Sequence, residues 1–351
     1  QFHFVNFKKN KQLLMPELFL TIFFISILLI FLGTGIWVAL SMVGVSAIGM
    51  LLFTSRPVGD AMATTIWGTS SSWTLTALPL FVWMGEILFR TKLSENLFKG
   101  LAPWLSRLPG GLIHVNVVGC ALFAAISGSS AATVATVGKM SIPELRKRNY
   151  PEKLLLGSLA GSGTLGLLIP PSIILIIYGV TVQESIAKLF IAGIIPGIML
   201  AIFFMLYVIG WSVLNKNIMP KMDETFSFFQ KIKQSGQLIP VIVLILAVIG
   251  SIYVGIATAT EAASLGVVGA LILSFFQKSL NKETFKLSLL GATKTSCMIA
   301  FILAGSSFLS LAMGFTGLPR NLAIWINEMG LSPYVLIMVL TFFYIILGMF
   351  L

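Results

Sequence analysis

Long apolar segments follow one another along this 351-residue chain, with only short polar connections between them. A helix needs about 20 mostly apolar residues to cross the hydrocarbon core of a bilayer. Segments of this kind are residues 14–32, 35–53, 74–90, 152–180, 187–214, 238–253, 255–276 and 287–314. Only 10% of the residues are charged, against roughly 25% in soluble domains. We therefore predict an all-α protein that crosses a membrane many times.

The basic residues are spread over the short connections rather than gathered on one domain. A net charge of +11 would fit a nucleic-acid partner only if the charge were clustered, so we expect no nucleic acid and a lipid bilayer instead. Lys and Arg in short loops mark the cytoplasmic side of a membrane protein. Basic residues outnumber acidic ones in three stretches, which we predict to be cytoplasmic: 90–153, 215–237 and 277–286.

Several residues recur at one constant offset along the chain, which indicates a duplicated unit. Gly85 corresponds to Gly305 and Gly128 to Gly348. A unit with an odd number of crossings enters the membrane upside down in its second copy, and inverted repeats are typical of secondary transporters. The predicted division is an N-terminal tail at 1–13, a first repeat at 14–214, a cytoplasmic connection at 215–237 and a second, incomplete repeat at 238–351.

Small polar residues interrupt the apolar segment at 112–140. They are Ser127, Gly128, Ser129 and Ser130. We predict a hairpin that enters and leaves the membrane on one side, because free hydroxyl and carbonyl oxygens at its tip would suit a hard cation. The alternative is close packing of an ordinary helix through its small residues.

Two prolines lie in the middle of the segment at 152–180. Pro170 and Pro171 follow a glycine-rich approach and precede Ser172. Proline removes a helical hydrogen bond and restricts the residue before it, so we predict a discontinuous helix near 166–171. A mere kink is the alternative.

A third interruption precedes the segment at 255–276. Thr258 and Glu261 have the spacing of a capping box, and Gly255 lies just before them. An acid within a membrane segment is a functional candidate, yet the capping box alone also explains Glu261, and both interpretations remain open. Glu86 has Arg90 four residues later, which predicts an ordinary helix-end ion pair.

The sequence contains no phosphate-binding loop of the Gly-x-x-x-x-Gly-Lys-Ser/Thr type, which argues against ATP-driven transport by this chain. With two His and two Cys we find no catalytic constellation, so we expect no enzyme, no catalytic residues and no tightly bound cofactor.

At these interruptions the chain resembles the large permease family of tripartite ATP-independent periplasmic (TRAP) transporters. The Phe-Ala-Ala-Ile-Ser-Gly-Ser-Ser run at 123–130 resembles the first hairpin of the family, and the Gly-Thr-Leu-Gly-Leu-Leu-Ile-Pro-Pro-Ser run at 163–172 is the most specific match. The segment at 258–262 is similar to Thr-Pro-Thr-Glu-Ala, with Ala259 in place of the proline.

The resemblance implies an elevator-type transporter of the inner membrane that couples sodium entry to the uptake of an organic acid, such as a C4-dicarboxylate, a sialic acid or a sugar acid. It also implies a small four-span membrane subunit (DctQ-like) and a periplasmic solute-binding protein as partners. The residues implied near a sodium ion are Ser127, Ser129, Gly255 and Thr258, and those implied at the substrate cavity are Ser130, Thr164, Pro170, Pro171, Ser172 and Glu261.

The apolar run at 331–351 is cut off by the last residue, where the family continues through a second hairpin and another broken helix. We therefore expect the chain to be truncated at its C-terminus and unable to transport if it ends there. Two other functions stay open: a two-component sodium:anion symporter without a binding protein, and a non-transporting fragment.

Overall fold

The computed structural model describes residues 19–90, 93–220, 227–236 and 238–350, and all regular structure in these ranges is helical. The predicted tail at 1–13 lies outside the described residues. The helices of the N-terminal half are Phe19–Gly33, α2 Val38–Phe53, α3 Val58–Ser70, η1 Trp73–Thr76, α4 Ala77–Phe89, α5 Leu93–Leu105, α6 Ile113–Ser127, α7 Ser130–Lys147, α8 Glu152–Gly163, η2 Thr164–Leu167 and α9 Ile173–Val182.

The helices that follow are α10 Ile186–Leu214, α11 Phe228–Ser235, α12 Ile239–Tyr253, α13 Ala259–Phe276, α14 Lys282–Phe315, α15 Leu318–Glu328 and α16 Pro333–Phe350. Among the described residues, three helices are long and apolar enough to cross a membrane alone: α10, α13 and α14. The number rises to five if each of two bent helix pairs is one span. The prediction of an all-helical protein with many apolar helices is confirmed.

The described helices form two compact units, one made of residues 71–299 and the other of the parts on either side. In the flanking unit, α2 meets the C-terminal half of α14. Met50 and Phe308 are fully buried there. The helices approach so closely that a Cβ atom on Gly305 would lie 2.8 Å from the carbonyl oxygen of Ala39.

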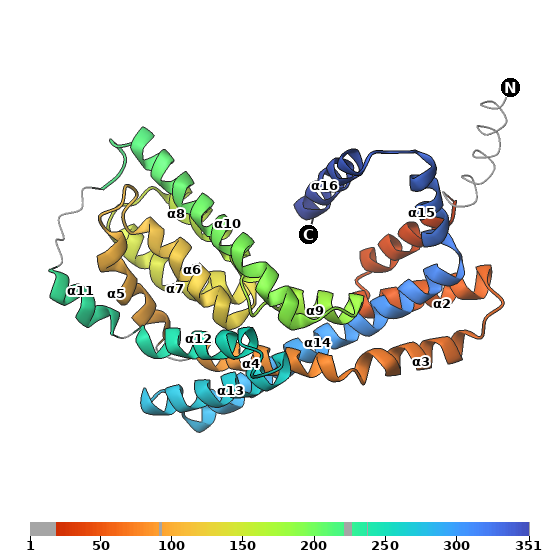
Figure 1. Cartoon of the computed structure of the whole chain (residues 1–351), viewed down its shortest axis with the longest axis horizontal. Coiled ribbons are helices and arrows are strands. Elements are labelled where there is room, and N and C mark those ends of the chain that lie inside the picture. The colour runs from red at the N-terminus through yellow and green to blue at the C-terminus, as the bar shows by residue number, and fades with distance from the viewer. Residues whose placement is uncertain (1–18, 91–92, 221–226, 237, 351) are drawn as a thin grey trace. The chain divides into compact units, whose positions relative to one another are not determined.

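The unit at 71–299 contains the segments that the sequence predicts to be functional. Its core is built on α4, which packs against α13 and α6, while α6, α7 and α8 lie side by side (Figure 1). Phe123 and Leu165 are fully buried in this core. A Cβ atom on Gly266 of α13 would lie 2.5 Å from the sulfur of Met84, so glycine is what allows α4 and α13 to approach.

Four helices occupy stretches that the sequence did not predict to be helical. Helix α3 covers Val58–Ser70, between two of the predicted apolar segments, with Asp60 in its first turn where an acid is favourable. The other three, α5, α11 and α15, are amphipathic and short of the length of a span. All four were missed because a search for 20-residue apolar runs passes over short or polar-faced helices.

Candidate functional site

The interruption predicted at 127–130 is a turn between α6 and α7. Helix α6 ends at Ser127, and Gly128 follows in the left-handed conformation with φ of 57°. Helix α7 then begins at Ser130, with Ser129 as its N-cap accepting a hydrogen bond from the backbone N–H of Ala132. Gly128 is therefore the residue whose backbone freedom breaks the helix.

The interruption predicted near 166–171 is also present. Helix α8 passes into a 3-10 turn that ends at Leu167, and α9 does not begin until Ile173. Between them, Ser172 is fully buried, and its hydroxyl donates to the carbonyl oxygen of Leu167 at 2.6 Å. The segment is thus broken rather than merely kinked, as expected from two consecutive prolines.

These two breaks pack directly against each other. The backbone N–H of Ile173 donates to the carbonyl oxygen of Gly128 at 3.4 Å. A Cβ atom on Gly128 would lie 2.7 Å from the carbonyl oxygen of Pro171, and one on Gly166 would lie 3.0 Å from the backbone nitrogen of Ser130. Backbone therefore touches backbone at the centre of the unit, and glycine is required on both sides of the contact.

Oxygen atoms gather at this double break. The hydroxyls of Ser127 and Thr133 are 3.0 Å apart, and the Ser127 hydroxyl also lies 3.3 Å from the carbonyl oxygen of Ser129. The buried hydroxyl of Ser130 has no hydrogen-bond partner among the described residues. Hydroxyl and carbonyl oxygens are ligands that a hard cation accepts, so this donor set fits sodium.

Glycines on the neighbouring helices bring those helices onto the double break. A Cβ atom on Gly193 of α10 would lie 2.7 Å from the carbonyl oxygen of Leu168, and one on Gly197 would lie 2.7 Å from Cγ1 of Ile169. From a different helix, a Cβ atom on Gly85 of α4 would lie 2.9 Å from Cα of Ser127. The sequence did not predict that these three glycines contact the double break, because their need for space depends on tertiary contacts.

The third interruption lies between α12 and α13. Gly255 has φ of 76°, and Thr258 caps α13 in the predicted capping box. The Glu261 carboxylate accepts from the backbone N–H and the hydroxyl of Thr258, both at 2.8 Å. No hydrogen bond within the described ranges joins Gly255 or Thr258 to the double break, so the four predicted sodium residues are found at two separate interruptions.

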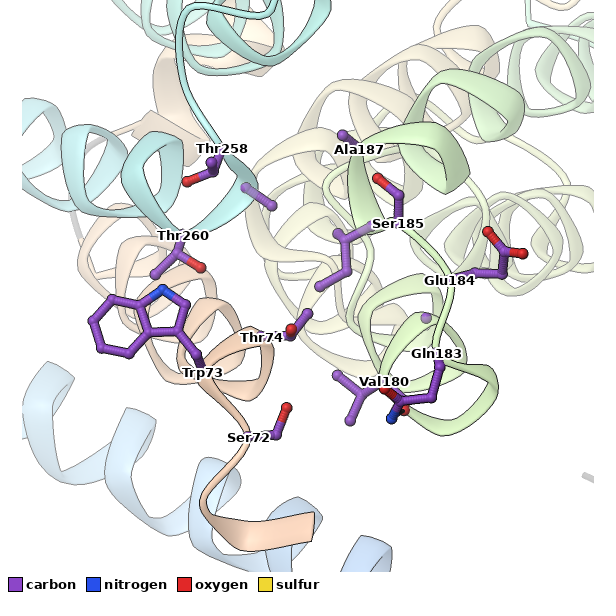
Figure 2. Close-up of a pocket in the computed structure, with 13 residues that line it drawn as sticks. Ser72, Trp73, Thr74, Val180, Gln183, Glu184, Ser185, Ala187, Thr258 and Thr260 are labelled. Carbon is purple, nitrogen blue, oxygen red and sulfur yellow. Dashed lines mark hydrogen bonds between the residues drawn. The ribbon is translucent and has the colours of Figure 1, made fainter. Parts of the chain in front are cut away.

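A pocket of about 440 Å³ opens beside this third interruption, where three turns meet (Figure 2). Its polar wall includes the N-cap residues Ser72 of η1, Ser185 of α10 and Thr258 of α13. In Figure 2, Trp73 lies near Thr260 on one side, and Ser185 and Glu184 lie on the other. Of the residues predicted from sequence, Thr258 lines this pocket; the others that line it carry no signal beyond ordinary turn composition.

The sequence matches the family described as "Tripartite ATP-independent periplasmic transporter, DctM component" over residues 23–351. The chain belongs to this family of TRAP transporter large permeases. It is a multi-pass membrane protein, and its relatives are transporter permeases rather than enzymes.

Three curated relatives illustrate the similarity. The permease is 32% identical to the C4-dicarboxylate TRAP transporter large permease protein DctM of Pseudomonas aeruginosa, over 87% of this chain and 70% of that protein. It is 31% identical to the 2,3-diketo-L-gulonate TRAP transporter large permease protein YiaN of Escherichia coli, over 82% and 67%. It is 29% identical to the isethionate TRAP transporter permease protein DctMQ of Oleidesulfovibrio alaskensis, over 92% and 50%.

The remaining predicted residues of the permease lie in contrasting surroundings. Pro170 and Pro171 are buried at the double break, whereas Thr164 is exposed and donates to the carbonyl oxygen of Gly161 at 2.7 Å. None of them lines the 440 Å³ pocket, so their roles at a substrate cavity stay predictions. The Glu86–Arg90 ion pair is confirmed, with 3.0 Å between Oε2 and Nη2.

Proposed function

We propose that this permease takes up an organic acid across the inner membrane and couples the uptake to sodium entry. The observation that supports this most is the contact between the two helix breaks. Discontinuous helices leave backbone groups free at the depth where transporters bind ions and substrates, and such backbone is tolerated in a membrane only when buried in protein or lining a cavity. The glycines at the contact keep these groups close together.

For the coupling ion we propose Ser127 and Ser129 as ligands. The Ser127 hydroxyl and the Ser129 carbonyl oxygen are already 3.3 Å apart, and the unpaired hydroxyl of Ser130 lies in the same turn. Gly255 and Thr258 belong to the proposed set as a second group, since the turn at Gly255 frees backbone at the other interruption.

The proposed substrate is a C4-dicarboxylate, a sialic acid or a sugar acid. The relatives from P. aeruginosa and E. coli are named for a dicarboxylate and a keto sugar acid, which are both carboxylates. Helix N-termini favour anions, and α7 and α9 both begin at the double break. We propose that the substrate cavity is formed by the predicted residues Ser130, Thr164, Pro170, Pro171, Ser172 and Glu261.

The proposed partners are a small four-span membrane subunit and a periplasmic solute-binding protein. The relative named DctMQ supports a small subunit, because its name joins two components and this chain covers only 50% of its length. The family description contains the words tripartite and periplasmic, which support a binding protein.

Uptake into proteoliposomes tests the proposal. The permease, its small subunit and a binding protein loaded with radiolabelled acid are combined with an inward sodium gradient, and potassium replaces sodium in the control. We expect uptake only with sodium, and a higher sodium concentration for half-maximal uptake in Ser127→Ala. Ser264→Ala serves as the matched control, because Ser264 is an exposed serine of α13 that bonds only its own helix. Equal uptake in potassium would exclude sodium coupling.

A further inference from the structure

Helices α5 and α11 are held together by a small set of side-chain contacts around Trp104. The indole N–H of Trp104 donates to the hydroxyl of Ser235 at 2.6 Å. The ammonium group of Lys231 lies 5.3 Å from the centroid of the indole ring, and the Phe228 ring meets the indole edge-on at 6.5 Å. The two helices lie beside each other at one end of the unit (Figure 1). Trp104 therefore fixes which side of α11 faces outward.

The outward side of this pair is apolar and open. The exposed fraction is 69% for Phe228, 75% for Phe229 and 51% for Ile232, and Trp104 itself is 47% exposed. We call these four residues the aromatic face. Three large apolar side chains on an eight-residue helix would be unfavourable in water. Helix α11 alone is about 12 Å long, too short to cross a bilayer, and its axis is bent by 57° from that of α12, the helix that follows it.

Positive charge borders the aromatic face at Lys233, which directly follows Ile232 in the last turn of α11 and is exposed. Lys99 in α5 and Arg107 just after α5 are further exposed basic residues of the same helix pair. The sequence contains no Asp or Glu in 99–111 or in 227–238. A basic border around an apolar face with Trp and Phe is the composition of helices that lie in the membrane interface, where long basic side chains reach anionic headgroups.

We propose that α5 and α11 form an anchor that lies in the membrane–water interface, inserts the aromatic face below the headgroups and binds anionic lipid through Lys233. The occupant of this face is lipid and not a protein, because the basic border complements an anionic headgroup layer. The anchor does not depend on the transported ion or substrate.

Nitroxide depth measurements test the insertion. A Cys297→Ser background leaves only the buried Cys120, and a spin label is attached at Phe229→Cys on the aromatic face or at Gln230→Cys on the next, polar position of α11. In the reconstituted complex with anionic lipid, we expect the label at 229 to collide several-fold more often with oxygen relative to a nickel chelate than the label at 230. Exclusion of both reagents at 229 means that protein covers the face, and preferential nickel access means that water does; either result overturns the proposal.

Lipid charge tests the second half of the proposal. With Lys233→Glu added, we expect the label at 229 to move toward the water in vesicles that contain phosphatidylglycerol, and to stay at the same depth in phosphatidylcholine vesicles. Gln234→Glu on the same turn introduces the same negative charge without removing Lys233 and should shift the depth less. An equal shift in both lipids would refute the role of anionic headgroups.

Discussion

Gly128 carries two constraints at once, since its backbone is left-handed and its Cα lies against the next break. In Gly128→Ala, the left-handed conformation alone costs about 1–2 kcal/mol, and the 2.7 Å approach to the Pro171 carbonyl adds strain. We expect a lower thermal unfolding midpoint in detergent. Gly157→Ala on α8 is the matched control, because nothing lies within 4 Å of its Cβ position and alanine favours a helix by roughly 0.5–1 kcal/mol. Equal midpoints for the two variants would contradict both the left-handed backbone of Gly128 and its close approach to Pro171.

Substitutions of Glu261 can distinguish a role in capping α13 from a role of its negative charge in transport. Its carboxylate is exposed and bound to Thr258, so Glu261→Gln should keep the midpoint, because an amide oxygen still accepts from the Thr258 backbone N–H. Glu261→Ala and Thr258→Ala should lower the thermal unfolding midpoint. Loss of the Thr258 cap lowers the unfolding free energy by about 1 kcal/mol, whereas Thr258→Ser keeps the cap and should keep the midpoint. Because Glu261 is among the residues proposed at the substrate cavity, we expect slower uptake by Glu261→Gln at an unchanged midpoint. Uptake near the parent rate would instead leave Glu261 with the capping role alone.

The break and the start of a helix could be predicted from the sequence where the local residues alone determine them. Pro170 and Pro171 break a helix in any surroundings, and a capping box at Thr258 starts one, so both positions were found. The contact between the breaks could not be predicted, because it depends on which helix surfaces meet in the folded unit. The pocket at Ser72 and Ser185 could not be predicted for the same reason, since serines in turns are common and only folding brings these two together.

Two glycines of α10, Gly193 and Gly197, contact the second break and lead to a prediction about the position of the whole helix. Gly193→Ala places a methyl group 2.7 Å from the Leu168 carbonyl oxygen, so α10 must move away from the second break. We expect slower uptake in the reconstituted complex together with a lower unfolding midpoint. Gly210→Ala lies on the same helix with nothing within 4 Å and should behave like the parent. If both variants transport normally, close packing of α10 is not needed for function.

The predicted inverted repeat concerns the molecule as a whole, and the distribution of basic residues predicts which side of the membrane each copy faces. Arg107 precedes the first predicted hairpin in a basic stretch, whereas Glu328 precedes the corresponding segment of the second repeat, where basic residues are sparse. Because basic loops stay in the cytoplasm, the two positions should lie on opposite sides of the membrane. Both side chains are exposed, so a cysteine at either position is accessible to a thiol reagent.

An impermeant maleimide applied to spheroplasts measures these sides in a Cys297→Ser background. We expect Glu328→Cys and Gln183→Cys to react in intact spheroplasts, and Arg107→Cys and Lys282→Cys to react only after permeabilisation. Gln183 and Lys282 are exposed residues at the ends of spans, so they report how the chain crosses between the two repeats. Reaction of Arg107→Cys and Glu328→Cys from the same side would mean that the second repeat is a parallel copy of the first repeat. The backbone breaks of the two copies would then face the same side, and alternating access would have to arise without the inversion that the charge pattern indicates.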